Sequence, residues 1–258
     1  MSSTFQKFKG LHASNELFLL PNAWDARSAK AFQECGFPAV ATSSAAVANS
    51  LGFDDGEKMS FQDYLFVIRR ILSSISIPLT VDIETGYGNN DEQIANNILH
   101  LAELGVAGIN IEDSVIEVSG RSLKDPIIFA RTIEHVRKKL EASNHKLFIN
   151  VRCDSHLLNV DNKQSDTITR IRIYNQSGAD GIFVPFLKNE EDISEVVANS
   201  KLPLNVMCVP ELPDLDSLSR LGVKRVSMGP FMFQRVYSDI SRLSKAIISS
   251  RTFSALLS

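Results

Sequence analysis

The chain has 258 residues, a net charge of −3 and a pI near 6.0. This charge balance, with no block of like charges, argues against a nucleic-acid partner. No apolar run approaches the roughly 20 residues that cross a bilayer, and residues 1–10 lack the apolar stretch of a secretory signal. The sequence therefore predicts a cytoplasmic protein with no membrane partner.

Eight short apolar runs recur along the chain, and each is largely continuous rather than alternating. Continuous runs rich in Val, Ile, Leu and Phe are typical of parallel strands that are buried on both faces. The predicted strands are Leu17–Leu20, Ala39–Thr42, Leu79–Ile83, Gly108–Ile111, Leu147–Val151, Gly181–Val184, Leu204–Met207 and Arg225–Met228.

An amphipathic helical pattern follows each run. The predicted helices are Ala26–Glu34, Ser60–Ser73, Glu92–Leu104, Pro126–Glu141, Thr167–Ser177, Glu190–Ala198, Leu215–Leu221 and Phe231–Ser249. In four places a glycine separates a helix from the next strand, as is common at helix ends. This alternation predicts a parallel sheet with right-handed crossovers.

Eight strand–helix units in a chain of this length favour a closed (β/α)₈ TIM barrel over an open doubly wound sheet. No dinucleotide-binding G-x-G-x-x-G motif follows a strand. We predict a single α/β barrel domain over residues 1–258, with a C-terminal helical segment over residues 231–258. The apolar stripe of the last helix predicts packing against its own barrel.

Acidic residues gather where the third and fourth predicted strands end, which is the end of a (β/α)₈ barrel that carries the active site. Asp82 and Glu84 are two residues apart and share one face of a strand, and Glu112 ends the adjacent strand. Three converging carboxylates would repel one another unless a cation lies between them. All-oxygen ligation suits Mg²⁺, with Mn²⁺ as an alternative.

Other polar residues at the strand ends have two interpretations each. Arg152 can grip a substrate carboxylate or pair structurally with Glu112. Ser43 and Ser44 can form a local turn or cradle a carboxylate with backbone N–H groups. Trp24 can be a wall of the site or part of the core.

Several segments resemble motifs of the isocitrate lyase / phosphoenolpyruvate mutase superfamily. Residues 82–88, D-I-E-T-G-Y-G, resemble its D-x-D-T-G-Y-G motif, and residues 105–113, G-V-A-G-I-N-I-E-D, resemble G-x-x-G-I-x-I-E-D. Residues 20–25, 51–55, 151–154, 203–206 and 222–229 also look familial. The resemblance runs from about Leu20 to Gly229, which is nearly the whole chain.

This resemblance implies a barrel enzyme that acts on a small 2-oxo carboxylate through an enolate. It implies that Asp82 ligates Mg²⁺ directly and that Glu84 and Glu112 hold it, mainly through water. It further implies that Ser43, with the N–H groups of Ser44 and Ala45, takes the substrate carboxylate. Asp55 is then a mobile acid over the site, and Arg152 binds the anionic oxygens. A homo-oligomer, dimer or tetramer, with C-terminal helices packed across subunits is also implied.

The loop after the fourth strand departs from the lyase pattern. Lyases of the superfamily carry K-[KR]-C-G-[HK] there, with the Cys as acid/base, whereas residues 114–125 read S-V-I-E-V-S-G-R-S-L-K-D. Isocitrate and 2-methylisocitrate lyase activities are therefore disfavoured. The loop, with Gly120-Arg121 at its centre, resembles a phosphonomutase-like branch. Glu84 also stands where Asp is more usual.

We therefore expect a Mg²⁺-dependent lyase that cleaves a C–C bond or decarboxylates a 2-oxo acid. Catalytic roles fall to Asp55, Arg152 and Glu112, and substrate binding to Ser43, Ser44, Ala45, Trp24 and Arg152. Two alternatives remain. One is a C–P mutase or hydrolase acting on phosphoenolpyruvate or phosphonopyruvate, and the other is a barrel that binds 2-oxo acids without turnover.

Overall fold

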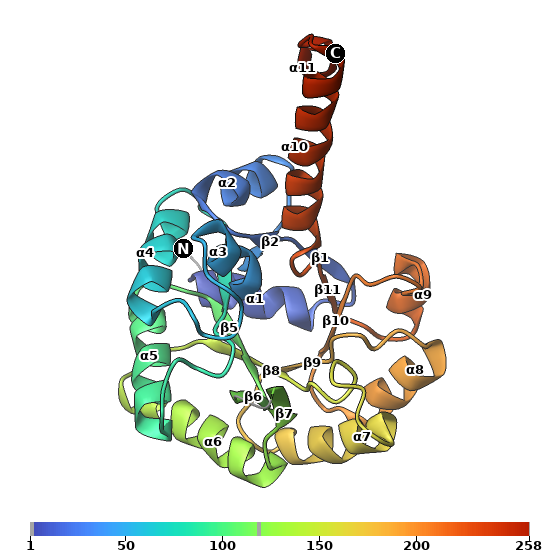
Figure 1. Ribbon diagram of the computed structural model, residues 1–258. Helices are drawn as coiled ribbons and strands as arrows, with labels where there is room; N and C mark the ends of the chain where they lie inside the picture. The colour runs from blue at the N-terminus through green and yellow to red at the C-terminus, as the bar shows by residue number, and fades with distance from the viewer. Residues whose placement is uncertain (1–2, 118–119, 258) are drawn as a thin grey trace.

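The parallel strands form a ring in which the start of the chain meets its last strand (Figure 1). This computed structural model describes residues 3–117 and 120–257; the ends of the predicted domain, Met1, Ser2 and Ser258, and two residues of the predicted loop, Val118 and Ser119, lie outside the described residues. The strands are β1 (Phe18–Leu20), β2 (Asn22–Ala23), β3 (Val40–Thr42), β4 (Leu79–Asp82), β5 (Gly108–Glu112), β6 (Ser114–Glu117), β7 (Gly120–Leu123), β8 (Phe148–Arg152), β9 (Gly181–Phe183), β10 (Leu204–Met207) and β11 (Arg225–Ser227). The main sheet has the order β1-β11-β10-β9-β8-β5-β4-β3-β2, and β6 and β7 form a separate antiparallel hairpin.

Pro21 separates two short strands, β1 and β2, that pair with different neighbours, and the predicted strand Leu17–Leu20 covers only β1. β1 pairs with β11, and β2 pairs with β3. The Pro21 carbonyl accepts a hydrogen bond from Ala41 N (2.8 Å), and Phe18 N donates to Lys224 O (3.0 Å). Because a proline has no N–H to give to a ladder, the break falls naturally at this residue. The two strands close the ring, and the predicted (β/α)₈ fold is confirmed.

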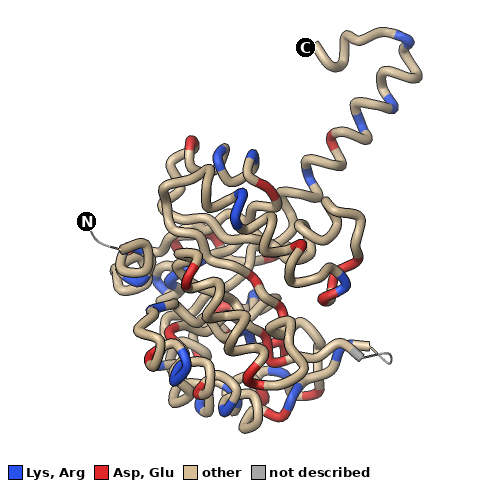
Figure 2. The backbone as a smooth tube through the Cα atoms, turned by 90° about the vertical axis from the view of Figure 1, so that its left-hand side faces the viewer, with Lys and Arg blue, Asp and Glu red and all other residues tan. Residues whose placement is uncertain are grey.

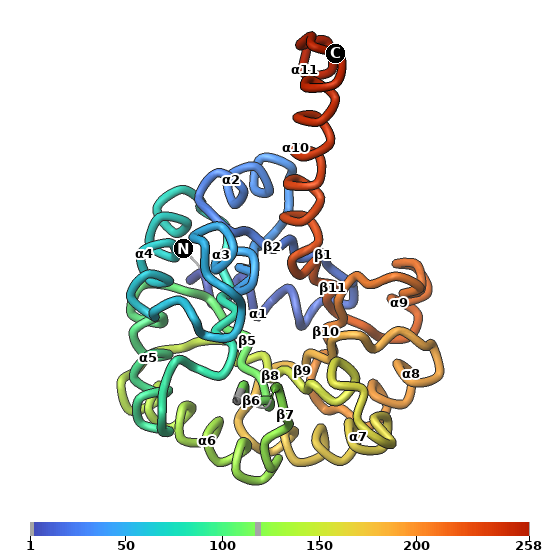
Figure 3. The backbone as a smooth tube through the Cα atoms, viewed as in Figure 1, coloured from blue at the N-terminus to red at the C-terminus, as the bar shows by residue number. Residues whose placement is uncertain are grey.

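Most of the helices surround the ring, whereas the last two helices project from it (Figures 1 and 3). The helices are α1 (Thr4–Ala13), α2 (Ala26–Glu34), α3 (Ser44–Ser50), α4 (Phe61–Leu72), α5 (Asp91–Glu103), α6 (Pro126–Ala142), α7 (Lys163–Tyr174), α8 (Glu190–Asn199), α9 (Leu215–Arg220), α10 (Phe231–Ser250) and α11 (Ser254–Leu257). Each of the eight predicted helices is present. Helices α1, α3 and α11 and the hairpin β6–β7 had no counterpart in the prediction.

Helix α1 closes the end of the barrel at which the strands begin. Phe8 is fully buried and meets the ring of Phe148 at 5.4 Å between centroids, while the ring of His12 stacks on Phe148 at 4.0 Å. Phe18 at the start of β1 joins the same cluster. One end of the barrel is therefore filled with aromatic side chains, so the opposite end is left for ligands.

Helix α10 leaves the barrel instead of packing along it (Figures 1 and 2). Phe233 near its start is its one buried residue in the described part of the chain, whereas Val236, Ile240 and Ile248 are exposed. The prediction that this helix packs against its own barrel is therefore wrong. In the described residues, the helices are too short or too polar to span a bilayer.

Candidate active site

A cavity of about 300 Å³ opens where the barrel strands end, on the side opposite α1. Six of the residues singled out in the sequence line it, namely Ser43, Ser44, Ala45, Asp55, Asp82 and Arg152. Phe183, Met207 and Phe231 supply apolar walls. The strand ends thus bring together one arginine, two aspartates and the start of α3 around a volume that suits a small carboxylic acid.

Asp82 at the end of β4 is a partly buried carboxylate with one side-chain donor. Ser44 Oγ donates to Asp82 Oδ2 (2.9 Å). The strand is fixed behind it, because Asp82 N donates to Thr42 Oγ1 (3.0 Å) and Tyr64 OH donates to the Asp82 carbonyl (2.8 Å). Burial raises the pKa of Asp82, and the charge of Arg152 and the Ser44 hydrogen bonds offset only part of that rise. Ser44 therefore both lines the cavity and donates a hydrogen bond that stabilises the Asp82 carboxylate.

Glu84 lies beyond the cavity lining because the backbone turns after Asp82. Its φ is +51°, and Tyr87 and Glu57 are also in the left-handed region, at +53° and +57°. Glu57 holds the turn, since its Oε1 accepts from Thr85 N (3.0 Å), Thr85 Oγ1 (2.6 Å) and Tyr87 N (2.9 Å). Non-glycine residues in this region cost free energy and persist only where surrounding contacts impose them.

The Glu84 carboxylate itself is held by two donors. Glu57 N donates to Oε2 (3.0 Å) and Tyr87 OH donates to Oε1 (3.1 Å). Burial raises the pKa of Glu84 to about 8, with further upward contributions from the charges of Asp55, Asp82 and Glu112. The negative charges of these carboxylates therefore repel that of Glu84, although each carboxylate has its own hydrogen-bond partners.

Glu112 at the end of β5 sits between two arginines. Arg152 Nη1 lies 2.8 Å from Glu112 Oε2, and Arg121 on β7 pairs with Glu112 Oε1. Burial raises the pKa of Glu112 to about 7 against the opposing charge of Arg152. Arg152 is thus both a wall of the cavity and an ion-pair partner of Glu112. The structural pairing is present, and the contact with a substrate carboxylate stays a prediction.

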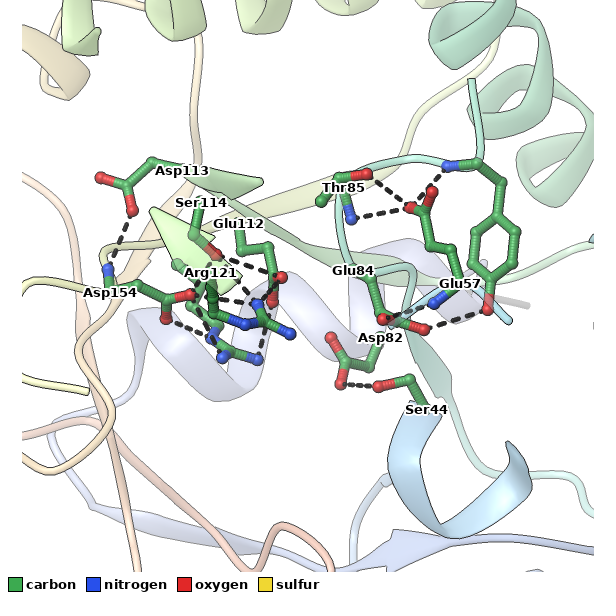
Figure 4. Close-up of polar contacts among 12 residues, drawn as sticks. Ser44, Glu57, Asp82, Glu84, Thr85, Glu112, Asp113, Ser114, Arg121 and Asp154 are labelled. Atoms are coloured by element: carbon green, nitrogen blue, oxygen red, sulfur yellow. Dashed lines mark hydrogen bonds and ion pairs between the residues drawn. The ribbon is translucent and has the colours of Figure 1, made fainter. Parts of the chain in front are cut away.

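Asp154 completes this cluster and ties it to the hairpin. Arg152 Nε donates to Asp154 Oδ1 (2.6 Å), and Ser114 Oγ donates to Asp154 Oδ2 (2.6 Å). Asp113 anchors it from behind by accepting from Asp154 N (2.9 Å). Figure 4 shows the two groups, with Asp82, Ser44 and Glu84 on one side and Glu112, Arg121 and Asp154 on the other.

Trp24 is the predicted substrate-binding residue that does not line the cavity. Its ring packs edge-on against Phe233 at 5.3 Å, on the outer side of the barrel where α2 and α10 begin. The sequence also left three contributors unassigned: Arg121, Glu57 and Tyr87. Glycine followed by arginine in a loop near an acidic strand end was the one available signal for Arg121. Nothing in the sequence distinguishes Glu57 from an exposed loop acid.

The carboxylates of Asp82, Glu84 and Glu112 are the kind of oxygen ligands that a divalent cation binds, although they do not converge on one point. In residues 3–117 and 120–257, no group of three acidic, His or Cys side chains is close enough to hold a metal ion. The pKa values of Asp82, Glu84 and Glu112 are nonetheless all raised, chiefly by burial of the carboxylates. Buried, mutually repelling carboxylates are what a hard cation relieves, so these residues fit one.

Known proteins resemble the chain over most of its length. An uncharacterized protein of Mycobacterium tuberculosis is 36% identical over 86% of this chain and 81% of its own length. Oxaloacetate decarboxylase of Ectopseudomonas mendocina is 29% identical over 86% of this chain and 77% of its own. The crystal structure of a candidate phosphonomutase from Burkholderia cenocepacia J2315 has a TM-score of 0.88 and 35% identity, covering 95% of this chain and all of that one.

The family model for phosphoenolpyruvate phosphomutase matches residues 8–248. That range contains the ring of strands, the cavity and both groups of polar residues around it. The motifs at residues 82–88 and 105–113 are the parts of the chain that supply Asp82 and Glu112. The chain therefore belongs to the phosphoenolpyruvate mutase family, within the isocitrate lyase / phosphoenolpyruvate mutase superfamily.

Proposed function

We propose that this protein is a divalent-metal-dependent lyase that decarboxylates, or otherwise cleaves a C–C bond in, a small 2-oxo carboxylate such as oxaloacetate. The observation that carries the proposal is the meeting of Asp82 and Arg152, both partly buried, in one small cavity at the strand ends. The similarity to an oxaloacetate decarboxylase over 86% of the chain supports the same substrate class.

Asp82 would hold the cation directly, and Glu84 and Glu112 would hold it through water. Mg²⁺ is the ion we propose, with Mn²⁺ as an alternative, because the donors are all oxygen. When bound, such a cation supplies Lewis-acid stabilisation of negative charge on the 2-oxo group. Ser44 keeps Asp82 oriented toward the cavity through its hydrogen bond to Oδ2.

Arg152 would bind the anionic oxygens of the substrate. Burial opposes its charge, but Glu112 and Asp154 outweigh burial and raise its pKa, so the guanidinium stays positive. Losing carbon dioxide leaves an electron pair that moves into the 2-oxo group as an enolate. The fixed charge of Arg152 favours that developing anion.

The remaining steps belong to the mouth of the cavity. Ser43, Ser44 and Ala45 line it at the start of α3, where we place the substrate carboxylate. Asp55 also lines it, from an exposed loop. Asp55, or a water that it holds, would return a proton to the carbon of the enolate. No cysteine acid is required, since carbon dioxide leaves without being protonated.

Substitution of Asp82 tests the scheme. We expect Asp82→Ala to abolish both Mg²⁺ uptake in calorimetry and enzymatic loss of oxaloacetate, measured as pyruvate formed above the rate without enzyme. Asp54→Ala is the matched control, because Asp54 is an exposed aspartate beside Asp55 that does not line the cavity. Undiminished turnover by the Asp82 variant in excess chelator would refute the scheme.

The family match also favours C–P chemistry as a second candidate. In that case phosphonopyruvate or phosphoenolpyruvate would be converted, and ³¹P NMR of the reaction mixture would show the product. Saturable binding of these acids without any product would favour the third interpretation, a binding barrel. A screen of small acids with Mg²⁺ by thermal shift, followed by product analysis, separates the three.

We also propose that the protein is a homo-oligomer in which α10 packs against a second subunit. The support is the exposure of its apolar residues: Val236 is 39%, Ile240 50% and Ile248 78% exposed. A helix of 20 residues that leaves the barrel with this surface open gains stability by covering it.

A further inference from the structure

The floor of the cavity carries an amide that neither the sequence analysis nor the proposed function uses. Asn110 lies in the middle of β5 and is the register partner of Asp82 on β4. Its side chain is 5% exposed and lines the cavity. Asp82 and Asn110 are therefore neighbours in the lining of the cavity.

Two donors beneath the floor fix which way this amide points. Arg225 Nη2 and Asn150 Nδ2 each lie 2.8 Å from Asn110 Oδ1. A guanidinium can only donate hydrogen bonds, so the atom that faces it must be the amide oxygen and the assignment does not depend on an amide flip. The amide nitrogen is consequently on the other side.

The Asn110 nitrogen is left open toward the cavity. Within the described residues Nδ2 has no hydrogen-bond partner, and it is not among the fully buried unpaired atoms. A neutral amide with its oxygen doubly occupied offers two N–H donors at this point. An oxygen-rich ligand is what such a group binds.

Arg225 is an unusual residue to find under this floor. It is fully buried on β11, and its Nε and Nη1 have no hydrogen-bond partner in the part of the chain that the structure describes. Burial lowers its pKa to about 9, and the charge of Asp82 acts in the opposite direction. The guanidinium thus remains charged at neutral pH. A buried charge without a carboxylate partner costs stability, which is what a functional role would explain.

We propose that Asn110 binds the 2-oxo carboxylate head group of the substrate through its Nδ2, and that Arg225 and Asn150 are positioning residues that hold the amide in this orientation. The inference rests on the proposed substrate class and deepens it. Arg225 also places a positive charge beneath the oxygen that Asn110 contacts. The head group would then be held by Arg152 from the side and by Asn110 from below.

Asn110→Asp gives the sharpest test because the two side chains have the same shape. The variant keeps an oxygen acceptor for Arg225 but replaces the open donor with a carboxylate oxygen. We expect the Kd of Mg²⁺-dependent oxalate binding, measured by calorimetry, to rise at least about tenfold, as for loss of a hydrogen bond to a charged group. We expect kcat/KM for oxaloacetate to fall about 100-fold.

Thr80→Val is the matched control in the same barrel interior. Thr80 lies two residues before Asp82 on β4, is 1% exposed and has an Oγ1 without a partner in residues 3–117 and 120–257. The replacement changes a buried polar atom without reaching the cavity. Oxalate affinity and turnover should match those of the wild type.

A double-mutant cycle tests the positioning role of Arg225. Arg225→Met should weaken oxalate binding about tenfold in the wild type but cause little further loss in Asn110→Ala, because the effect passes through the amide. Its thermal midpoint should not fall, since an apolar side chain of similar size replaces an unpaired buried charge. Equal losses in both backgrounds would overturn the positioning role.

The outcomes separate the two proposals. Wild-type oxalate affinity in Asn110→Asp, with oxaloacetate still decarboxylated, would overturn the role of Asn110 and leave the proposed function standing. Loss of oxalate binding in that variant would support Asn110 even if oxaloacetate proves not to be the substrate. A wild-type protein that neither binds oxalate nor turns over a 2-oxo acid would overturn both.

Discussion

Arg121 is an unpredicted cation at the predicted metal site, where it pairs with Glu112. It comes from the hairpin that replaces the lyase loop, and its side chain is 19% exposed. Its guanidinium pairs with Glu112 and donates a hydrogen bond to Ser114 Oγ (2.9 Å). Arg121 does not line the cavity. A protein cation therefore already neutralises one of the acids that would hold Mg²⁺.

Removing this charge should strengthen metal binding. We expect Arg121→Gln to lower the Kd for Mg²⁺ about 3- to 10-fold, because Glu112 loses one of its two arginines and about 1 kcal/mol of competing attraction. Calorimetric titration measures the change. Arg121→Lys, which keeps the charge, should stay near the wild-type value. Weaker Mg²⁺ binding by the glutamine variant would show that Arg121 supports the site instead of competing for it.

The residues of the site divide into those whose position the sequence predicts and those that depend on tertiary contacts. Position at strand ends was enough to identify Asp82, Ser43 and Arg152, because strand periodicity and barrel geometry fix where they face. Glu84 shares a strand face with Asp82 only if the strand continues. The left-handed φ of Glu84 ends it at Asp82, and the contacts of Glu57 that impose this φ come from a distant loop.

Among the structural elements, the apolar pattern identified every strand of the main sheet except β2 to within one residue at each end. It missed α1 because that helix has only a weak apolar face and docks through two residues, Phe8 and His12. It missed the hairpin β6–β7 because short strands away from the core carry no apolar periodicity. Helix α1 and the hairpin β6–β7, which the sequence did not predict, are thus elements that a few tertiary contacts hold in place.

Helix α1, which closes one end of the barrel, makes the stability of the protein depend on pH through His12. Burial, and then the charge of Arg225, lower its pKa to about 3, while the Phe8 carbonyl, 3.0 Å from Nδ1, acts in the opposite direction. Below about pH 6.5, His12 binds a proton in the unfolded chain but stays neutral in the folded chain. The free energy of unfolding therefore decreases as pH falls toward 3. Between pH 7 and 5 this amounts to about 2 kcal/mol.

Replacing His12 should remove that part of the acid sensitivity. We expect the loss of unfolding free energy between pH 7 and 5, measured by urea denaturation, to be about 2 kcal/mol smaller in His12→Phe. His145→Gln, on the loop after α6, is the control and should keep the wild-type slope. An unchanged slope in the phenylalanine variant would mean that His12 titrates normally in the folded state.

The exposed apolar side of α10 predicts that the protein assembles into an oligomer. Val236 and Ile240 are one turn apart on its exposed side. We expect Val236→Glu combined with Ile240→Lys to convert the oligomer to monomers in analytical ultracentrifugation. Ser241→Lys, which adds charge at a polar position of the same helix, should leave assembly intact. A wild-type protein that sediments as a monomer at micromolar concentration would contradict the proposed oligomer.

The break between β1 and β2 at Pro21 has a consequence for how the chain reaches its native state. β1 needs β11 as its partner, so the ring cannot close until Ser227 has left the ribosome. Until then β2 can pair with β3, but the hydrogen bonds from Met228 and Gly229 to Asn22 Oδ1 do not exist. Contacts between residues this far apart in sequence form slowly. Nascent chains should therefore remain protease-sensitive through most of translation and become resistant only near its end.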